Sequence, residues 1–146
     1  MEISERLRRQ REARFIEGVG AFIRRDFEAI EKTMRPDVVM RLPGWSWLAG
    51  TYHGPEEVGR CILRLRQVLE SNEDRISFRH DEDRMIVTHD IKLHGALHHI
   101  DLSFTIGVGY NSDERVKSIS VEPADLGLFD HVLKSSLVAS DSSRFA

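Results

Sequence analysis

The first residue whose type and position could support chemistry is His89, within the segment Met85 to Leu93. Apolar and other side chains alternate along this segment, and an extended strand places every second residue on one face. His89 then lies on the same face as Val87 and Ile91, as a polar residue among apolar ones. A neutral imidazole on a pocket wall could orient a substrate or accept a proton from it. A core histidine hydrogen-bonded to a neighbouring strand or to Tyr52 is the alternative.

A second candidate group is aromatic and lies in the segment LPGWSWLAGTYHGPEEV, from Leu42 to Val58. Trp45, Trp47 and Tyr52 each combine a large apolar face with one polar group, and together they could close over a flat apolar ligand. The alternative is that they fill the interior as core residues. We expect at least one of them at a rim, because alternate positions in a loop rarely all reach the interior.

Histidine and cysteine are also possible metal ligands, but their spacing does not favour a metal site. Gly95 and Ala96 are expected to turn the chain between His94 and the pair His98 and His99, and adjacent strand residues point to opposite faces. The sequence therefore predicts a histidine-rich surface hairpin, with no metal and no cofactor. The one cysteine, Cys61, cannot form an internal disulfide and lies on the apolar side of a predicted helix, as a core residue would.

The elements that would position these residues follow from hydrophobic periodicity and from helix and turn signals. Helices are expected over residues 3–25, over a short segment capped by Asp26 and ending before Pro36, and over residues 55–70. Strands are expected at 37–42, 49–53, 76–80, 85–93, 97–110 and 116–122. Residues 126–137 suit a short helix or an extended arm, and residues 139–146 a mobile tail, so that residues 1–138 form a single domain.

This order of elements predicts an α+β fold, in which helices pack on one face of a curved, mixed or antiparallel sheet. Such a sheet leaves a conical space between itself and the helices. Side chains fill that space, or a ligand occupies it. Met40, Leu42, Ile119 and Val121 lie on predicted strands and are the expected walls.

Composition and charge exclude some classes of binding partner. A formal net charge of −3 and a pI near 6.2 argue against nucleic acid, which needs a basic surface. The sequence has no apolar run long enough to span a membrane, and its charged N-terminal residues do not resemble a signal peptide. We therefore expect a cytoplasmic protein that contacts neither nucleic acid nor membrane.

Four stretches resemble SnoaL-like proteins of the nuclear-transport-factor-2-like superfamily: RDFEAI at 25–30, DVVM at 37–40, PGWSWLAGTYHGPEEV at 43–58 and EPADLGLFD at 122–130. The resemblance runs from about Phe15 to Leu133. It implies a cystatin-like fold, a cone-shaped α+β barrel that often dimerises through the open face of its sheet. Members of the superfamily include ketosteroid isomerases, polyketide cyclases, dehydratases and epoxide hydrolases, so the resemblance is specific for fold and weak for function.

The resemblance bears on the catalytic residues in two ways. Ketosteroid isomerases carry two catalytic aspartates at positions that match Leu42 and Ile106 here, and neither of these side chains can transfer a proton. In the polyketide cyclases an acidic residue at the end of the last strand acts as acid and base, and it matches Asp125. The alternative for Asp125 is the N-cap of a helix that begins at Leu126.

Together these features predict a homodimeric protein with a pocket for a small hydrophobic molecule. As an enzyme it would be a cofactor-independent cyclase, isomerase or dehydratase that transfers protons on a carbonyl compound, with Asp125 as acid and base and His89 as the orienting group. The alternative is a non-catalytic ligand-binding or dimerisation module whose cone is filled by its own side chains.

Overall fold

The computed structural model describes residues 3–24, 26–69, 73–94 and 99–134, and its elements follow the predicted order. The helices are α1 (Glu5–Arg24), α2 (Phe27–Thr33) and α3 (Gly54–Val68). The strands are β1 (Met34–Leu42), β2 (Gly50–His53), β3 (Glu73–His80), β4 (Arg84–His94), β5 (His99–Tyr110) and β6 (Val116–Pro123). Residues 126–134 are also helical, which decides between the helix and the arm predicted there, whereas the predicted tail at 139–146 lies outside the described residues.

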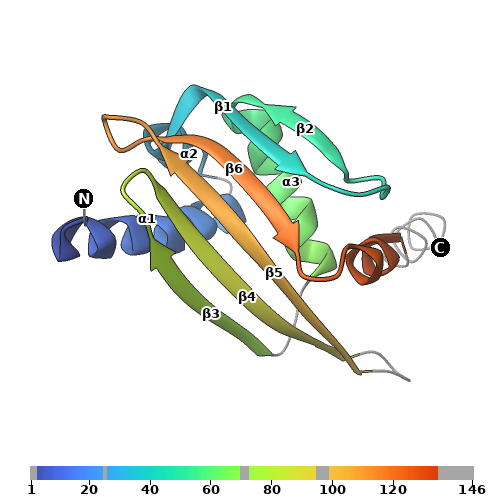
Figure 1. The fold of residues 1–146 in the computed structure, drawn as a ribbon. Coiled ribbons are helices and arrows are strands. Elements are labelled where there is room, and N and C mark those ends of the chain that lie inside the picture. The colour runs from blue at the N-terminus through green and yellow to red at the C-terminus, as the bar shows by residue number, and fades with distance from the viewer. Residues whose placement is uncertain (1–2, 25, 70–72, 95–98, 135–146) are drawn as a thin grey trace.

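The strands form one six-stranded sheet in the order β2-β1-β6-β5-β4-β3. Its neighbours are antiparallel except for β1 and β6, which run parallel. This parallel pair joins the first and last strands of the chain, so everything between them forms the crossover (Figure 1). The sheet is curved and open, with β2 and β3 at its edges, and the fold is α+β as predicted.

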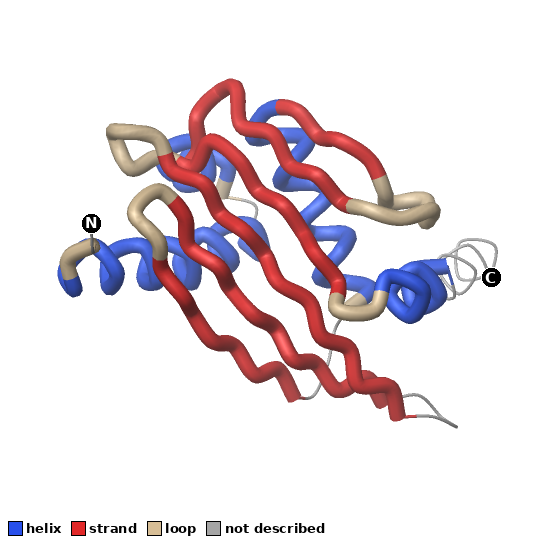
Figure 2. The backbone as a smooth tube through the Cα atoms, viewed as in Figure 1, coloured by secondary structure: helices blue, strands red, loops and turns tan. Residues whose placement is uncertain are grey.

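Helices α1, α2 and α3 pack on one face of this sheet, as Figure 2 shows. Their apolar sides meet the sheet's inner face, where the predicted alternation of buried and less buried residues is confirmed in β1: Val38, Met40 and Leu42 are buried. The helices within the described ranges are too short or too polar to cross a lipid bilayer.

Local signals explain where the helices begin. The carboxylate of Asp26 accepts a hydrogen bond from the backbone N–H of Ala29 at 3.2 Å, which confirms the predicted N-cap of α2. Helix α3 begins at Gly54, whose φ of +84° lies in the left-handed region that glycine adopts easily. Glu57 reaches back one turn to accept from the backbone N–H of His53 at 2.6 Å, which satisfies the backbone donor of the N-cap residue.

Candidate functional site

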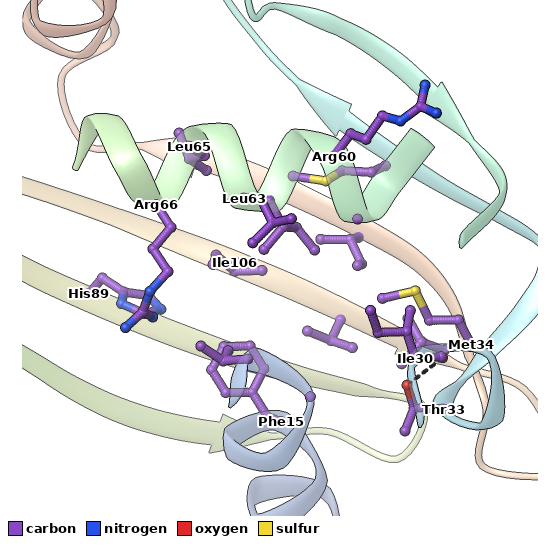
Figure 3. Close-up of a pocket in the computed structure, with 18 of the residues that line it drawn as sticks. Phe15, Ile30, Thr33, Met34, Arg60, Leu63, Leu65, Arg66, His89 and Ile106 are labelled. Atoms are coloured by element: carbon purple, nitrogen blue, oxygen red, sulfur yellow. Dashed lines mark hydrogen bonds between the residues drawn. The ribbon is translucent and has the colours of Figure 1, made fainter. Parts of the chain in front are cut away.

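A cavity of about 900 Å³ lies between the helices and the inner face of the sheet (Figure 3). Every helix from α1 to α3 contributes to its lining, as do β1, β4, β5 and β6. Most lining side chains are apolar, and among them are Phe15, Ile30, Leu63, Phe104 and Ile106. The cavity is therefore a mainly apolar chamber, and its few polar side chains are the candidates for specific contacts with a ligand.

Helix α3 presents two adjacent faces to the rest of the protein. Val58, Cys61 and Leu65 are buried and join the main hydrophobic core. A neighbouring face at intervals of three and four residues consists of Gly59, Ile62, Leu63 and Arg66, all of which line the cavity. The helical repeat thus places Arg66 at the end of this row, and Arg60, Arg64 and Gln67 of the same helix also line the cavity.

His89 lies on the sheet wall of the cavity, in β4. It pairs with Phe104 across the β4–β5 ladder, and the two rings stack at a centroid distance of 4.9 Å with an interplanar angle of 7°. The ring of Phe15 from α1 approaches the same imidazole, with a centroid distance of 6.3 Å. Two aromatic neighbours therefore fix the plane of the imidazole at the cavity surface.

Five charged residues lie along the lining: Arg14, Arg60, Arg64, Arg66 and Glu114. The four arginines are exposed and therefore lie at the rim of the cavity rather than inside it. Arg60 pairs with Glu56 at 2.5 Å, and the Arg64 guanidinium lies 5.8 Å from the ring centroid of Trp47.

At the α1 end of the cavity, a buried cluster anchors the helix. Arg11 is buried and binds the Glu114 carboxylate through two nitrogens, each at 2.9 Å. It also donates to the backbone carbonyls of Asp81 and Glu82, so its guanidinium is satisfied by four hydrogen bonds. Burial raises the pKa of Tyr110, beneath this guanidinium, to about 12. The cluster is structural, and it holds α1 against the β3–β4 and β5–β6 turns.

The predicted wall residues divide between cavity and core. Met40 and Ile119 line the cavity, whereas Leu42 and Val121 are buried but are not part of its lining. Leu42 lies near the end of β1, where the strand packs into the core rather than along the chamber.

The predicted aromatic rim is not at the cavity. Trp45 is 86% exposed, and its backbone N–H donates to both carboxylate oxygens of Asp130, at 3.2 and 3.1 Å. The Trp47 indole N–H donates to the carbonyl of Leu133 at 3.2 Å. Tyr52 is half-buried, its hydroxyl donates to the carbonyl of Leu48, and burial raises its pKa to about 12. The bonds of Trp45 and Trp47 fasten the loop after β1 to the helix at 126–134, and the bond of Tyr52 ties β2 to the same loop.

Asp125 is exposed, and its carboxylate accepts from the backbone N–H of Leu128 at 3.0 Å. It caps the helix at 126–134, as the structural alternative expected, and does not line the cavity. The structure thus separates the two residues expected to work together, since only His89 is at the chamber.

The possible metal ligands do not form a site in the described parts of the chain, where no group of three or more His, Cys, Asp or Glu could hold a metal ion. His98 lies outside the described residues, and the structure does not describe the side chains of His94 and His99. Cys61 is 1% exposed, and burial raises the pKa of its thiol to about 11, so it is a protonated core residue at neutral pH.

Arg66 is one of the polar cavity residues that the sequence-based predictions did not include. A signal for it exists in the sequence, because positions 59, 62, 63 and 66 share one helical face next to the apolar stripe of α3. Alone, however, a basic residue in the last turn of a helix is also explained by the helix dipole.

No protein-family model and no curated protein matches this sequence. Solved structures do resemble it over most of its length. One is an NTF2-like protein of unknown function from Burkholderia pseudomallei, with 21% identity and a TM-score of 0.60, covering 84% of this chain and 95% of that one. Another is a protein of unknown function with a cystatin-like fold from Xanthomonas campestris, with 16% identity and a TM-score of 0.59, covering 79% and 91%.

The chain has the nuclear-transport-factor-2-like fold. A third similar structure, a steroid delta-isomerase from Pseudomonas aeruginosa, agrees with this: it has 18% identity and a TM-score of 0.58, covering 92% of this chain and 93% of that one. At such identities the likeness extends to the fold and not to the activity, because this fold hosts many unrelated sites.

Proposed function

We propose that this NTF2-like protein binds a small hydrophobic molecule in the cavity, with His89 contacting a polar group of that molecule. The observation that carries the proposal is a chamber of about 900 Å³ whose apolar sheet wall contains one oriented imidazole. Ligand pockets in proteins commonly measure roughly 300–1,000 Å³ and combine apolar walls with a few fixed polar groups. The chamber is also the reason to prefer ligand binding over a dimerisation module whose cone is filled by its own side chains.

The finer proposal is a reaction on a carbonyl compound by proton transfer at His89. An imidazole can donate to a carbonyl oxygen or accept a proton from the adjacent carbon, which is the step that cyclases, isomerases and dehydratases share. In the sequence resemblance, Leu42 and Ile106 match the catalytic aspartates of the isomerases. Neither side chain can transfer a proton, so His89 is the residue we propose for proton transfer. Asp125 is not needed in this scheme.

Binding is tested with a fused-ring ketone such as a tetralone, titrated into the protein by calorimetry. Ile106→Trp places an indole at a position that lines the cavity, and we expect it to abolish binding. Ile86→Trp makes the matched change in the neighbouring strand, at a position that pairs with Gly107 and is not part of the lining, and we expect binding to persist. Equal loss in both variants, or unchanged binding in Ile106→Trp, would contradict the proposed site.

The reaction is tested by proton exchange on the same ketone in D₂O, followed by NMR. We expect the wild-type protein to accelerate exchange at the carbon next to the carbonyl, His89→Phe to remove the acceleration, and Asp125→Asn to retain it. If Asp125→Asn loses the acceleration of exchange and His89→Phe retains it, Asp125 and not His89 is the catalytic residue.

Homodimerisation, and kinship with the SnoaL-like branch in particular, stay predictions of the sequence resemblance. Sedimentation equilibrium measures the first directly. A monomer at micromolar concentration would contradict it without affecting the cavity proposal.

A further inference from the structure

We infer that the ligand of the cavity is an amphipathic anion, with an apolar body in the chamber and a carboxylate bound by Arg66 at its rim. This inference rests on the proposed function and names the class of molecule that the site would take. It depends on the position of Arg66 and on the charges around the cavity.

The position of Arg66 follows from the helical repeat of α3. Gly59, Ile62 and Leu63 precede it on the cavity face, so its stem continues an apolar surface before its guanidinium reaches the rim. In Figure 3 the side chain extends from α3 toward His89, whereas Arg60, which also lines the cavity, extends away from His89. A group held by Arg66 would therefore continue into the space in front of the sheet wall.

The charges around the cavity distinguish Arg66 from the other arginines. Arg60 pairs with Glu56, Arg64 lies over Trp47, and Arg14 donates to the backbone carbonyl of Glu114 at 3.2 Å. Arg66 has no carboxylate within ion-pair distance among the described residues.

The acidic residue of the cavity lining already has a partner. Glu114, the acidic residue of the lining, is bound at both oxygens by the buried Arg11. Among the described residues, carboxylates therefore leave the charge of three rim arginines unpaired, Arg14, Arg64 and Arg66. Arg14 is held by a backbone carbonyl and Arg64 lies over Trp47, so Arg66 is the one of the three that extends along the cavity face of α3 toward the sheet wall.

A carboxylate suits this position for physical reasons. The planar guanidinium matches a carboxylate with two parallel hydrogen bonds. At the rim both charges keep part of their hydration, so the large penalty of burying a charge inside the apolar chamber is avoided. The apolar body of the same molecule gains from leaving water as it enters the cavity.

The inference is tested with two matched probes, naphthylacetate and its neutral primary amide, titrated into the full chain. We expect the wild-type protein to bind the acid about fivefold more tightly than the amide at low salt, a preference in the range of partly exposed ion pairs. Arg66→Gln should remove this preference and leave amide binding unchanged. Arg35→Gln is the control and should retain the preference, because Arg35 is paired with Asp37 and does not line the cavity.

Arg66→Lys separates a binding role from a structural one. It keeps the positive charge but lacks the planar fork, so we expect it to retain part of the preference for the acid. If Arg66 only stabilises the end of α3, Arg66→Gln will weaken acid and amide equally, and the inference is overturned.

The remaining outcomes distinguish this inference from the proposed function. Equal affinity of the wild-type protein for acid and amide overturns the anionic ligand and leaves the cavity proposal standing. Absence of binding for both probes and for the fused-ring ketone overturns the cavity proposal and this inference with it.

Discussion

Two regions of this protein carry aromatic and polar residues that could do chemistry, and the fold uses them differently. At the chamber, His89 lies on the sheet wall in β4 and Arg66 lies at the rim on α3. At the loop end, formed by residues 43–53 and 124–134, the polar groups of Trp47 and Asp130 are bonded to other parts of the same region. Residue type alone does not show which polar groups bind a ligand and which stabilise the fold. At the loop end, backbone N–H and C=O groups need hydrogen-bond partners, and the side chains of Asp130 and Trp47 provide them.

The loop end is built around Gly44 and Asp130. Gly44 has a φ of +107°, and a Cβ placed there would lie 2.2 Å from Asp130 Oδ1. The missing side chain lets the buried carboxylate reach the backbone N–H of Trp45. This region is therefore expected to govern stability, and the chamber is expected to govern binding.

The largest expected effect is at the loop end, from Gly44→Ala. Left-handed backbone and the close approach to Asp130 together should lower the free energy of unfolding by about 3 kcal/mol. Urea denaturation measures this change. Gly50→Ala is the matched control, because its φ of +147° is also unusual but no atom lies within 4 Å of the added Cβ. An equal effect at Gly50 would show that backbone strain, and not contact with Asp130, holds the loop.

A second effect concerns the core beside the loop end and depends on pH. Burial raises the pKa of Cys61 from about 9 to about 11, so the unfolded chain loses this proton before the folded chain does. Stability from Cys61 is then complete below pH 9 and lost as the pH rises through 11, by roughly 1.5 kcal/mol between pH 8.5 and 10.5. Denaturation at both pH values measures it.

Cys61→Ala is the control for the alkaline loss. Tyr110, whose pKa is also raised, titrates in both proteins and cancels in the difference. Tyr52 interacts with Cys61, which helps to raise its pKa, so the difference between wild type and variant measures the thiol together with its coupling to Tyr52. Identical losses in the two proteins would show that the thiol does not contribute.

A smaller effect separates capping from catalysis at Asp125. Asp125→Ala should lower the free energy of unfolding by about 1 kcal/mol through loss of the N-cap, and Asp125→Asn should preserve it, since asparagine caps as well. Neither should change binding of the fused-ring ketone. Weaker ketone binding in Asp125→Asn, with unchanged stability, would place Asp125 at the functional site and break the division between the two regions.

The smallest expected effect on stability is at the chamber wall. His89→Phe should change the free energy of unfolding by less than about 1 kcal/mol, because a phenyl ring of similar shape can stack on Phe104. Ligand affinity should fall severalfold in the same variant. A stability loss as large as that of Gly44→Ala would identify His89 as a core residue instead.

The sequence by itself determined the elements and the inner face of the sheet. The alternation of apolar residues around His89 and the apolar stripe along α3 are local patterns. Local periodicity can be read from one sequence, because it depends only on residues a few positions apart. The N-cap at Asp26 and the start of α3 near Pro55 were predictable for the same reason, since caps depend on residues only a few positions apart.

Tertiary structure decided which candidates meet at the cavity. The parallel pairing of β1 and β6 and the bonds from Asp130 to Trp45 join positions far apart in the chain, and no local pattern encodes them. Hydrogen bonds to Asp130 and Leu133 hold Trp45 and Trp47 at the last helix, whereas His89 lines the cavity. Arg66 became visible as a candidate only when the cavity face of α3 was known, because the same residue in the last turn also complements the helix dipole.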